Sequence, residues 1–327
     1  MTDQIRWGIL STANIGRKAV IPAIQASRNG VVAAVASRSA EKAETFARDL
    51  NIPQAYPTYE ALIAAPDIDA IYNPLPNADH AAWSLRCAEA GKPALCEKPL
   101  ARDGDEAQSM VDAFASREVL FAEAFMYRFH PQTQRVRELL QDGRVGDPLV
   151  LNATFTFQIR RENDIRLDLS LAGGALMDVG CYCVNVMRLL AGEEPTAMRA
   201  AAQVGERSGV DEVLTGLLTF PSGVEGHFDC SLRAHRTHTY EIRGTQGRIL
   251  VESGFVMPAD TETTIRVWHG DAYEAMRIPP ANSYQLMVED FADALLQSRP
   301  PRFAPQDAVD NMRVLDALRA AAGMVPF

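Results

Sequence analysis

The stretch Ala94-Leu-Cys-Glu-Lys-Pro-Leu100 joins a short apolar run to an acid, a lysine and a proline. The run Ala94–Cys96 predicts a short buried strand. Proline disfavours helical dihedrals in the residue before it, so Lys98 is expected to leave the strand in extended backbone. In open α/β sheets, ligands bind at the carboxyl ends of strands. Taken alone, a Glu-Lys-Pro sequence is more typical of a solvated turn, so its interpretation depends on the surrounding chain.

The first half of the chain alternates between short apolar strands and helices. Strands are predicted at Ile5–Leu10, Val31–Ala36, Ala70–Asn73 and Val119–Ala122. This alternation predicts a parallel, doubly wound sheet, in which all strands end at one shared edge. That edge carries Ser11–Gly16, Ser37-Arg38, Asn73–Asn77 and Glu97-Lys98. Lys98 therefore becomes a candidate site residue.

The segment Ile5–Ala36 has the length of a dinucleotide-binding βαβ unit. Its loop, Ser11-Thr-Ala-Asn-Ile-Gly16, has Ser11 and Ala13 where the first two glycines of the usual fingerprint stand. Small residues still allow close backbone approach, and free N–H groups at a helix start can hold a pyrophosphate. A strand-turn-helix unit of some other α/β protein is the alternative.

The end of the second strand bears on the choice of dinucleotide. NAD-binding units place an acid there to hold the ribose hydroxyls, whereas this chain has Ser37, Arg38 and, one turn later, Lys42. A hydroxyl and two cations attract a 2′-phosphate. The sequence therefore favours NADP over NAD. The alternative is that Ser37 caps the next helix and both bases are solvated.

The chain changes character after Glu123. Residues 123–131 resemble a crossover between domains, and strand-like segments then follow one another up to Trp268. Consecutive strands indicate an antiparallel sheet. We therefore expect an N-terminal Rossmann domain over 1–123 and a substrate and oligomerisation domain over 124–327. Two helices close the chain, and the last one, 306–322, is expected near the junction of the domains.

The helix Gly173–Gly192 interrupts the strands and contains only two charged residues, one of them Asp178. A buried, unpaired carboxylate is costly, so Asp178 needs a partner. Tyr182 and Asn185 follow four and seven residues later and share its face. A structural Asp–Tyr pair is the simpler interpretation. A lysine from the facing domain edge, Lys98, would make the pair catalytic.

Composition narrows the class of protein. A chain of 327 residues suits two domains. A net charge of −10 argues against binding to nucleic-acid backbones or anionic membranes. No apolar run approaches about 18 residues, so no transmembrane helix is expected. The segment Met1–Arg6 leads directly into a strand rather than a signal sequence, and we expect a cytoplasmic protein.

The cysteines and histidines of the chain do not form a recognisable metal-binding motif. The five cysteines form no Cys-x-x-Cys pair and suit a reducing compartment. His235 and His238 lie in a strand-like segment without an obvious acidic ligand, so a structural or solvent-facing role is expected for them. No metal site is expected.

Two motifs together resemble one enzyme family. Glu97-Lys98-Pro99, followed by Gly174-x-x-x-Asp178-x-Gly180-x-Tyr182, is similar to the glucose–fructose oxidoreductase/inositol dehydrogenase (Gfo/Idh/MocA) family. Residues 123–131 and 164–182 resemble its branch of NADP-dependent D-xylose dehydrogenases and dihydrodiol dehydrogenases. The similarity extends over nearly the whole chain.

The resemblance implies a Rossmann domain followed by a domain with a large open, mostly antiparallel sheet covered by helices on one face. It implies hydride transfer between exchangeable NADP and a sugar, polyol or dihydrodiol. It also implies a homodimer or homotetramer formed through the C-terminal sheet.

The resemblance further implies roles for individual residues. Lys98 would hold the substrate hydroxyl and the nicotinamide ribose, Tyr182 would be the acid/base, and Asp178 would orient the substrate. The residues implied at the cofactor are Ser11, Thr12, Ala13, Asn14 and Ile15 at the pyrophosphate, Ser37, Arg38 and Lys42 at the 2′-phosphate, and Leu75, Pro76, Asn77, His80, Glu97 and Arg128 near the ribose or nicotinamide. Specificity is expected in the loop Arg160–Arg166, including Arg166, and near Phe157, Trp268 and Tyr284.

The chemistry of these residue types supports a proton transfer beside the hydride transfer. Free tyrosine titrates near ~10 and lysine near ~10.4, and a nearby charge moves a pKa by ~1–3 units. The ammonium of Lys98 would make Tyr182 a base in oxidation and an acid in reduction. Lys98 as the base remains an alternative.

Three other functions are compatible with the sequence. They are a keto-sugar or carbonyl reductase with the same site, a glycosidase that uses a trapped nicotinamide, and a non-catalytic NADP sensor. An intact Lys98, Asp178 and Tyr182 set argues against the sensor.

Overall fold

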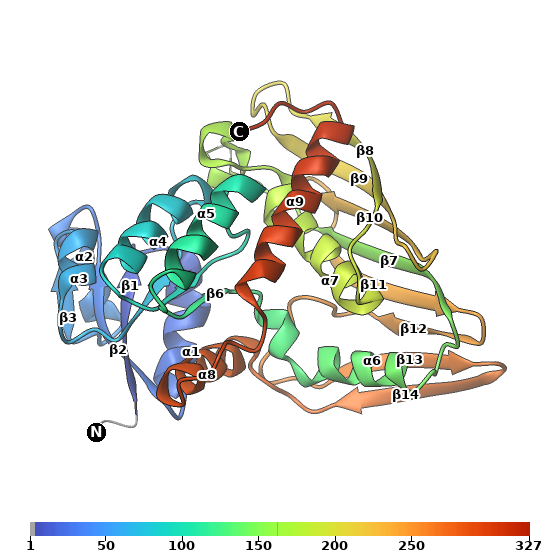
Figure 1. Ribbon diagram of the computed structural model, residues 1–327, viewed down its shortest axis with the longest axis horizontal. Helices are drawn as coiled ribbons and strands as arrows, with labels where there is room; N and C mark the ends of the chain where they lie inside the picture. Colours follow the sequence, from blue (N-terminus) through green and yellow to red (C-terminus); the bar gives the residue numbers. More distant parts are fainter. Residues whose placement is uncertain (1–3, 162) are drawn as a thin grey trace. The chain divides into compact units, whose positions relative to one another are not determined.

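The structure of the protein is a computed structural model that describes residues 4–161 and 163–327. Met1–Asp3 and Glu162, which belong to the expectations on the N-terminus and on the loop Arg160–Arg166, lie outside the described residues. The chain divides into two compact units (Figure 1). The first comprises the chain up to Met126 together with Tyr284–Val309, and the second comprises Tyr127–Ser283 and Asp310–Phe327.

The first unit is built on a six-stranded sheet of order β3-β2-β1-β4-β5-β6. Each neighbouring pair of its strands is parallel, which confirms the doubly wound sheet expected from the sequence. Its strands are β1 (Ile5–Leu10), β2 (Gly30–Ala36), β3 (Gln54–Tyr56), β4 (Ala70–Asn73), β5 (Ala94–Cys96) and β6 (Phe121–Glu123). All residues of β4 and β5 are buried, as expected for central strands covered on both faces.

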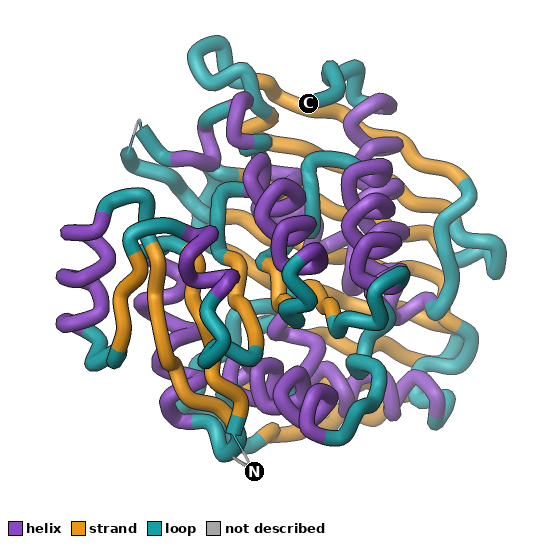
Figure 2. The backbone as a smooth tube through the Cα atoms, turned by 60° about the vertical axis from the view of Figure 1, so that its left-hand side comes forward, coloured by secondary structure: helices purple, strands orange, loops and turns teal. Residues whose placement is uncertain are grey.

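Helices flank both sides of this sheet (Figure 2). They are η1 (Gly16–Val20), α1 (Ile21–Ala26), α2 (Ala40–Asp49), α3 (Tyr59–Ala64), η2 (Asn77–Asp79), α4 (His80–Glu89), α5 (Gly104–Ala115) and α8 (Ser283–Leu296). Side chains cap several of them: Thr58 Oγ1 accepts a hydrogen bond from Ala61 N, and Asp103 Oδ1 accepts one from Glu106 N. Such caps satisfy the free N–H groups of a first turn and set where the helix begins.

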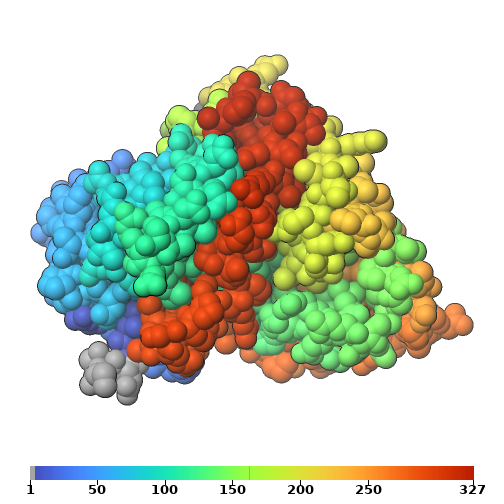
Figure 3. All heavy atoms as spheres, in the orientation of Figure 1, coloured from blue at the N-terminus to red at the C-terminus, as the bar shows by residue number. Residues whose placement is uncertain are grey.

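Helix α8 lies beside the N-terminal part of the chain (Figure 3). The amide of Asn29 donates hydrogen bonds to Glu289 O at 2.9 Å and Asp293 Oδ1 at 2.8 Å. The rings of Trp7 and Phe291 lie 5.2 Å apart. Residues 284–309 thus belong to the first unit, whereas the sequence had assigned all of 124–327 to one domain. The contacts that hold α8 in the first unit join residues far apart in the sequence, so no local sequence pattern predicts them.

The second unit is built on an eight-stranded sheet of order β14-β13-β12-β11-β7-β10-β9-β8. Only β7 and β10 pair in parallel; the other described pairs are antiparallel. The strands are β7 (Pro148–Thr156), β8 (Ala197–Val204), β9 (Asp211–Thr219), β10 (Glu225–Ser231), β11 (Thr237–Gly244), β12 (Gly247–Val251), β13 (Thr263–His269) and β14 (Ala272–Ile278). The sheet confirms the mostly antiparallel arrangement expected from the sequence.

One face of this sheet is covered by helices, among them α6 and α7 (Figure 1). In β7, Leu151, Ala153 and Phe155 are buried, and the residues between them are partly exposed, which is the alternation expected of a sheet with one open face. The helical elements of this unit are η3 (Met126–Phe129), α6 (Pro131–Gln141), η4 (Ile165–Leu167), η5 (Leu169–Leu171), η6 (Leu176–Gly180), α7 (Cys181–Ala191) and α9 (Pro305–Ala321). Helix α9 begins in the first unit, because the division falls between Val309 and Asp310.

The segment Leu169–Ala191 has the length and mean hydropathy of a membrane-spanning helix. Its most apolar window, however, is 78% buried inside the protein. Burial of this kind is expected of a helix that fills a core, and the apolar residues of α7 pack against β7 and β10.

Candidate active site

The residues predicted to bind the cofactor lie mostly in the loops that follow the strands of the first unit. The carboxyl ends of five neighbouring strands are in register, since Leu10 pairs with Ala36, Ile9 with Tyr72, Asn73 with Cys96, and Cys96 with Glu123. The loops that leave these strands therefore start from one edge, as expected for a parallel sheet.

The loop after β1 is shaped like the start of a dinucleotide site. Ser11 has a φ of 70°, in the left-handed region that favours glycine, which explains why the fingerprint normally has glycine there. The helix that follows begins at Gly16, and the side chain of its N-cap residue Ile15 makes no capping hydrogen bond. Arg17 N–H donates to Ala13 O at 3.1 Å, so a phosphate would have to be held by N–H groups that precede Arg17.

The loop after β2 leaves two cations exposed. The side chain of Ser39 caps α2 by accepting from Lys42 N, so the alternative that Ser37 caps this helix is wrong. Ser37 is buried and accepts from Ser39 N at 3.3 Å, while the side chains of Arg38 and Lys42 are exposed. A cation pair beside a hydroxyl fits a 2′-phosphate.

Glu97 is buried and anchors the stretch that begins at Ala94. Its backbone N–H donates to Asn73 O at 3.0 Å, and its carboxylate accepts from Tyr72 OH at 2.6 Å. Burial, and then the charge of Glu97, raise the pKa of Tyr72 well above its ordinary value, so this hydroxyl keeps its proton and donates. Burial, and then Glu97, also raise the pKa of Tyr284, which places Tyr284 in the surroundings of this carboxylate. Lys98, half-buried, follows directly.

His80 is fully buried and joins two of these loops. Its Nδ1 lies 2.9 Å from Pro99 O and its Nε2 lies 2.8 Å from Leu75 O. Burial lowers its pKa, against the effect of these carbonyl contacts. Since both nitrogens face backbone carbonyls, His80 supports the loops that carry Leu75–Asn77 and Lys98.

Tyr182 lies in the second unit, on α7 beneath the sheet. Its side chain is only 5% exposed, and its ring is packed among three aromatic rings: Phe155 at 5.3 Å, Phe255 at 5.5 Å and Tyr127 at 5.9 Å. Rings at these separations hold a side chain in one orientation. The sequence analysis did not identify these three neighbours, which come from separate elements.

Asp178 has a cationic partner that the sequence analysis did not assign to it. Arg166 Nε donates to Asp178 Oδ2 at 2.7 Å, and the Asp178 side chain is 13% exposed. The charge of Asp178 is the main cause of a raised pKa for Arg166. Asn185, expected to share a face with Asp178, accepts a hydrogen bond from Tyr127 OH at 2.7 Å. Arg166, predicted at the substrate, thus holds the carboxylate predicted to orient the substrate.

Asp211 of β9 supports the start of the same helix. It is fully buried, and its Oδ2 accepts from Leu176 N at 2.7 Å. Burial raises the pKa of Asp211 to about 6. Gly174 has a φ of 120°, and a Cβ there would collide with Asp211 Oδ1, which explains the need for glycine before this helix.

Two other predicted residues belong to the second unit. Trp268 lies on β13, after the buried residues Ile265 and Val267 and before the exposed His269. The guanidinium of Arg248 lies 3.8 Å from the centroid of the Trp268 ring. By strand alternation Trp268 points to the open face of the sheet, opposite Phe155. Sequence spacing did not reveal which face it occupies, and its place near the substrate stays a prediction. Arg128 is buried, 3% exposed, in η3.

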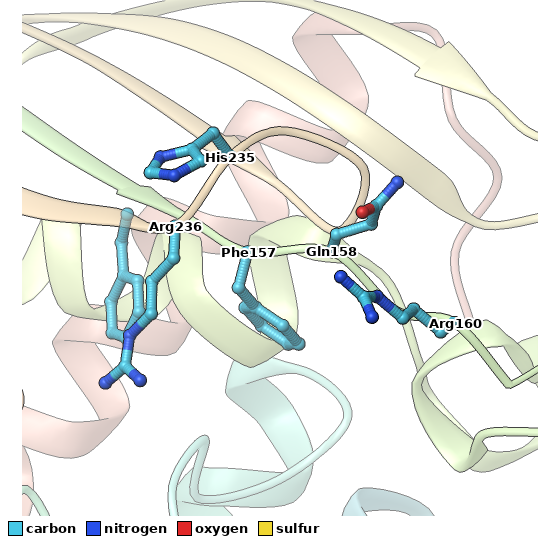
Figure 4. A pocket seen from close by; sticks show the side chains of 6 residues that line it. Phe157, Gln158, Arg160, His235 and Arg236 are labelled. Carbon is cyan, nitrogen blue, oxygen red and sulfur yellow. The ribbon is translucent and has the colours of Figure 1, made fainter.

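Phe157 lines a cavity of about 510 Å³ at the end of β7 (Figure 4). The lining residues come from the end of β7 and the connection from β10 to β11. They are Phe155, Phe157, Gln158, Arg160, His235 and Arg236. Because β7 and β10 are parallel neighbours, both segments leave the sheet at the same edge. His235 was expected to be structural or solvent-facing. Its proximity to Phe157 follows from the pairing of β7 with β10, which the sequence did not reveal.

Among the described residues, no group of three His, Cys, Asp or Glu side chains could hold a metal ion.

Two family models match the chain. The model described as "Oxidoreductase family, NAD-binding Rossmann fold" matches residues 5–125, and the GFO/IDH/MocA C-terminal domain matches residues 133–250. Together they span most of the first unit and the central part of the second.

Named relatives match most of the chain. D-xylose 1-dehydrogenase (NADP(+)) 2 of Haloferax volcanii is 38% identical over 97% of this chain and 97% of the relative. Trans-1,2-dihydrobenzene-1,2-diol dehydrogenase of Mus musculus is 36% identical over 76% of this chain and 74% of the relative.

A solved structure has the same fold. KijD10, a 3-ketoreductase from Actinomadura kijaniata in complex with NADP and TDP-benzene, superposes with a TM-score of 0.93 at 30% identity, over 97% of this chain and 98% of KijD10. Further KijD10 structures carry a tyrosine-to-phenylalanine change or a change of one lysine.

Proposed function

Because the chain belongs to the GFO/IDH/MocA family of oxidoreductases, we propose that it transfers hydride between NADP and a carbon of a sugar, polyol or dihydrodiol. The relatives act, by their names, on D-xylose and on a dihydrobenzenediol. The observation that carries the proposal is the strand edge of the first unit, with its dinucleotide loop and its exposed cations after β2.

The first unit supplies the residues for NADP. The N–H groups after Ser11 would hold the pyrophosphate, and Ser37, Arg38 and Lys42 would hold the 2′-phosphate. When bound, the nicotinamide supplies the carbon that gives or accepts the hydride. Leu75–Asn77, held in place through His80, would border the ribose.

Tyr182 is the proposed acid/base, and Lys98 is its proposed electrostatic partner. A hydroxyl carbon gives up hydride only as the hydroxyl loses its proton, and a phenolate near an ammonium can accept that proton at neutral pH. In KijD10, the altered lysine and tyrosine have the same separation along the chain as Lys98 and Tyr182 here. This agreement supports a joint role for the two residues.

Asp178 is proposed to orient the substrate. Its carboxylate is positioned by Arg166, and a carboxylate has acceptor sites for more than one donor. It can therefore accept a hydrogen bond from a substrate hydroxyl while it remains paired with Arg166.

Reduction of a keto-sugar is the second candidate. It uses the same residues in the opposite direction, with Tyr182 as the acid. The observation in its favour is the similarity to 3-reductases of TDP-linked keto-sugars, such as the Actinomadura kijaniata enzyme at 30% identity over 99% of this chain and 98% of that enzyme.

The open face of the second sheet is the proposed site of self-association, and the cytoplasm is the proposed location. That face presents apolar side chains, among them Leu217, which is 47% exposed, and Tyr273, which is 53% exposed. Measuring the solution mass of wild type and Leu217→Glu by light scattering tests the association. A monomeric wild type would contradict it.

A two-directional substrate screen tests the reaction. NADP⁺ reduction is followed at 340 nm with aldoses, polyols and dihydrodiols, and NADPH oxidation with the matching carbonyl compounds. We expect turnover with at least one sugar, polyol or dihydrodiol pair and a lower KM for NADP than for NAD. A protein that binds NADPH but turns over no member of the panel in either direction would contradict the proposal.

A further inference from the structure

The cavity beside Phe157 has a charge that contrasts with the rest of the protein. The chain as a whole carries a net charge of −10. The described residues that line the cavity include Arg160, His235 and Arg236 and no acidic side chain. Two guanidinium groups that line one cavity create a local positive potential in an acidic protein, and such a potential attracts anions.

The contacts of these two guanidinium groups differ from those of most other arginines. Most arginines of this chain pair with carboxylates, such as Arg166 with Asp178 and Arg233 with Glu212. Neither Arg160 nor Arg236 forms an ion pair with another of the described residues. The donor fork of each is thus available to a ligand in the cavity.

The charge of Arg236 also acts on a neighbouring histidine. Burial, and then the charge of Arg236, lower the pKa of the nearby His238. The Nδ1 atom of His238 is buried without a hydrogen-bond partner among the described residues. An anion bound beside Arg236 would offset the charge of this guanidinium.

One lining residue of the cavity also packs against Tyr182. Phe155 lines the cavity, and its ring lies 5.3 Å from the ring of Tyr182. Phe157 lies between Arg236 and Arg160 in the view of Figure 4, and the guanidinium of Arg166 lies 5.9 Å from its ring. A volume of about 510 Å³ is within the ~300–1,000 Å³ typical of small-molecule sites.

Resting on the proposed function, we infer that the substrate carries an oxyanion, held by Arg160 and Arg236, at the end remote from the reacting carbon. The sugar body would lie over Phe155 and Phe157, and the reacting hydroxyl would face Tyr182. Planar guanidinium forks bind carboxylate and phosphate oxygens in pairs. The ligand chemistry is therefore that of a sugar acid or of a sugar phosphate, free or linked to a nucleotide.

Binding to the full chain saturated with NADPH tests this independently of turnover. Calorimetric titrations compare the affinity for D-glucose with that for D-glucuronate, D-glucose 6-phosphate and dTDP-glucose. The three anionic compounds distinguish a preference for a carboxylate, a phosphate or a nucleotide-linked diphosphate. We expect at least one anionic compound to bind tenfold or more tightly than D-glucose. Equal or tighter binding of the neutral sugar would overturn the inference.

Variants show whether the two arginines are responsible. In Arg160→Gln/Arg236→Gln, the affinity ratio of the preferred anion to D-glucose falls at least tenfold. In Arg160→Lys/Arg236→Lys, part of that ratio returns, because charge is kept and the planar fork is lost. The matched control is Arg233→Gln, whose arginine lies outside the cavity and pairs with Glu212 at 3.1 Å; its ratio stays within twofold of wild type. An unchanged ratio in the glutamine variant would overturn the inference.

Parallel turnover assays keep the two proposals distinguishable. Turnover of neutral sugars with no anion preference contradicts the oxyanion site and leaves the oxidoreductase function intact. Arginine-dependent anion binding without turnover of any compound contradicts the proposed function and leaves the ligand class of the cavity intact. Retained NADPH affinity and thermal midpoint show that each variant is folded.

Discussion

The strand ends of the first unit and the helix of the second unit that carries Tyr182 are built in different ways. At the strand ends, backbone conformation does most of the positioning: Ser11 has a positive φ, and Glu97 N–H bonds to Asn73 O. Around Tyr182, side chains from several elements do it, including Phe155 and Phe255. A site made of backbone tolerates many side chains, whereas a site made of side-chain contacts depends on each of them.

This difference suits what each region is proposed to bind. A pyrophosphate is the same in every reaction of a dinucleotide, and N–H groups at a helix start recognise it without any particular side chain. A substrate differs from enzyme to enzyme, so its recognition depends on replaceable residues such as Arg160 and Arg236 at the ends of β7 and β10.

The largest effect is expected from removing the proposed proton-transfer groups. Tyr182→Phe deletes the acid/base and Lys98→Ala deletes its partner, and each lowers kcat/KM by about 10²–10⁴-fold. Both variants are expected to bind NADPH within a few-fold of wild type, measured by fluorescence titration. Near-normal turnover of either variant would show that the two regions do not share one reaction.

A second effect separates the two regions by pH. The pKa of Asp211 is raised to about 6 from an ordinary value of ~3.9, so the folded state binds this proton more tightly than the unfolded state. The group therefore favours folding at low pH, and this contribution is lost as pH rises from about 4 through about 6. The loss amounts to on the order of 2–3 kcal/mol.

Asp211→Asn removes that titration. Between pH 4 and pH 7, wild type is expected to lose free energy of unfolding relative to the asparagine variant, as measured by chemical denaturation. The isosteric amide keeps an acceptor for Leu176 N. Parallel pH profiles for the two proteins would mean that Asp211 does not change its protonation on unfolding in this range.

A third effect concerns the cofactor side. Arg38→Gln/Lys42→Gln is expected to raise the KM for NADP about tenfold, because charge-assisted hydrogen bonds to the phosphate are lost. The KM for NAD stays within twofold. Arg48→Gln, an exposed arginine later in α2, serves as the control. If NADP and NAD respond alike, the 2′-phosphate is held elsewhere.

The smallest effect compares two buried tyrosine hydroxyls, one in each unit. Tyr72→Phe removes the donor to the Glu97 carboxylate, and Tyr127→Phe removes the donor to the Asn185 amide. The loss of a hydrogen bond to a charged group costs ~1.5–3 kcal/mol and to a neutral group ~1 kcal/mol. Urea unfolding should therefore show Tyr72→Phe to be the less stable variant by about 1 kcal/mol. Equal losses would mean that the charge of Glu97 is satisfied by other groups.

Much of the first unit could be predicted from local patterns. The apolar runs at β1, β2, β4 and β5, and the turns after them, identified the sheet and its ligand edge, and Lys98 follows β5 as expected. The three-residue strand β3 was missed because Gln54–Tyr56 is not fully buried and lacks the apolar run that marks the equally short β5. Helix α8 was assigned to the other domain because the residues that it contacts, Asn29 and Trp7, are separated from it in the sequence by most of the chain.

Less of the second unit could be predicted from local sequence patterns. Asp178 was correctly expected to need a partner, but Arg166 was identified as that partner only by the structure. Trp268 was placed near the substrate by residue type alone, and its face follows from the pairing of β13 with β12 and β14. His235 joins Phe157 through the parallel pairing of β10 with β7. Each of these outcomes depends on how strands pair.

By itself, the sequence determined the strands β1, β2, β4 and β5 of the first unit, the strand-end positions of Ser11, Ser37 and Lys98, and the shared motif of Asp178 and Tyr182. These features depend on local periodicity and backbone preference, which neighbouring residues carry. Only the tertiary structure decided which charge Asp178 pairs with, which rings orient Tyr182, and that Arg160 and Arg236 line one cavity. The physical reason is that these contacts join residues whose proximity is created by strand pairing and helix packing.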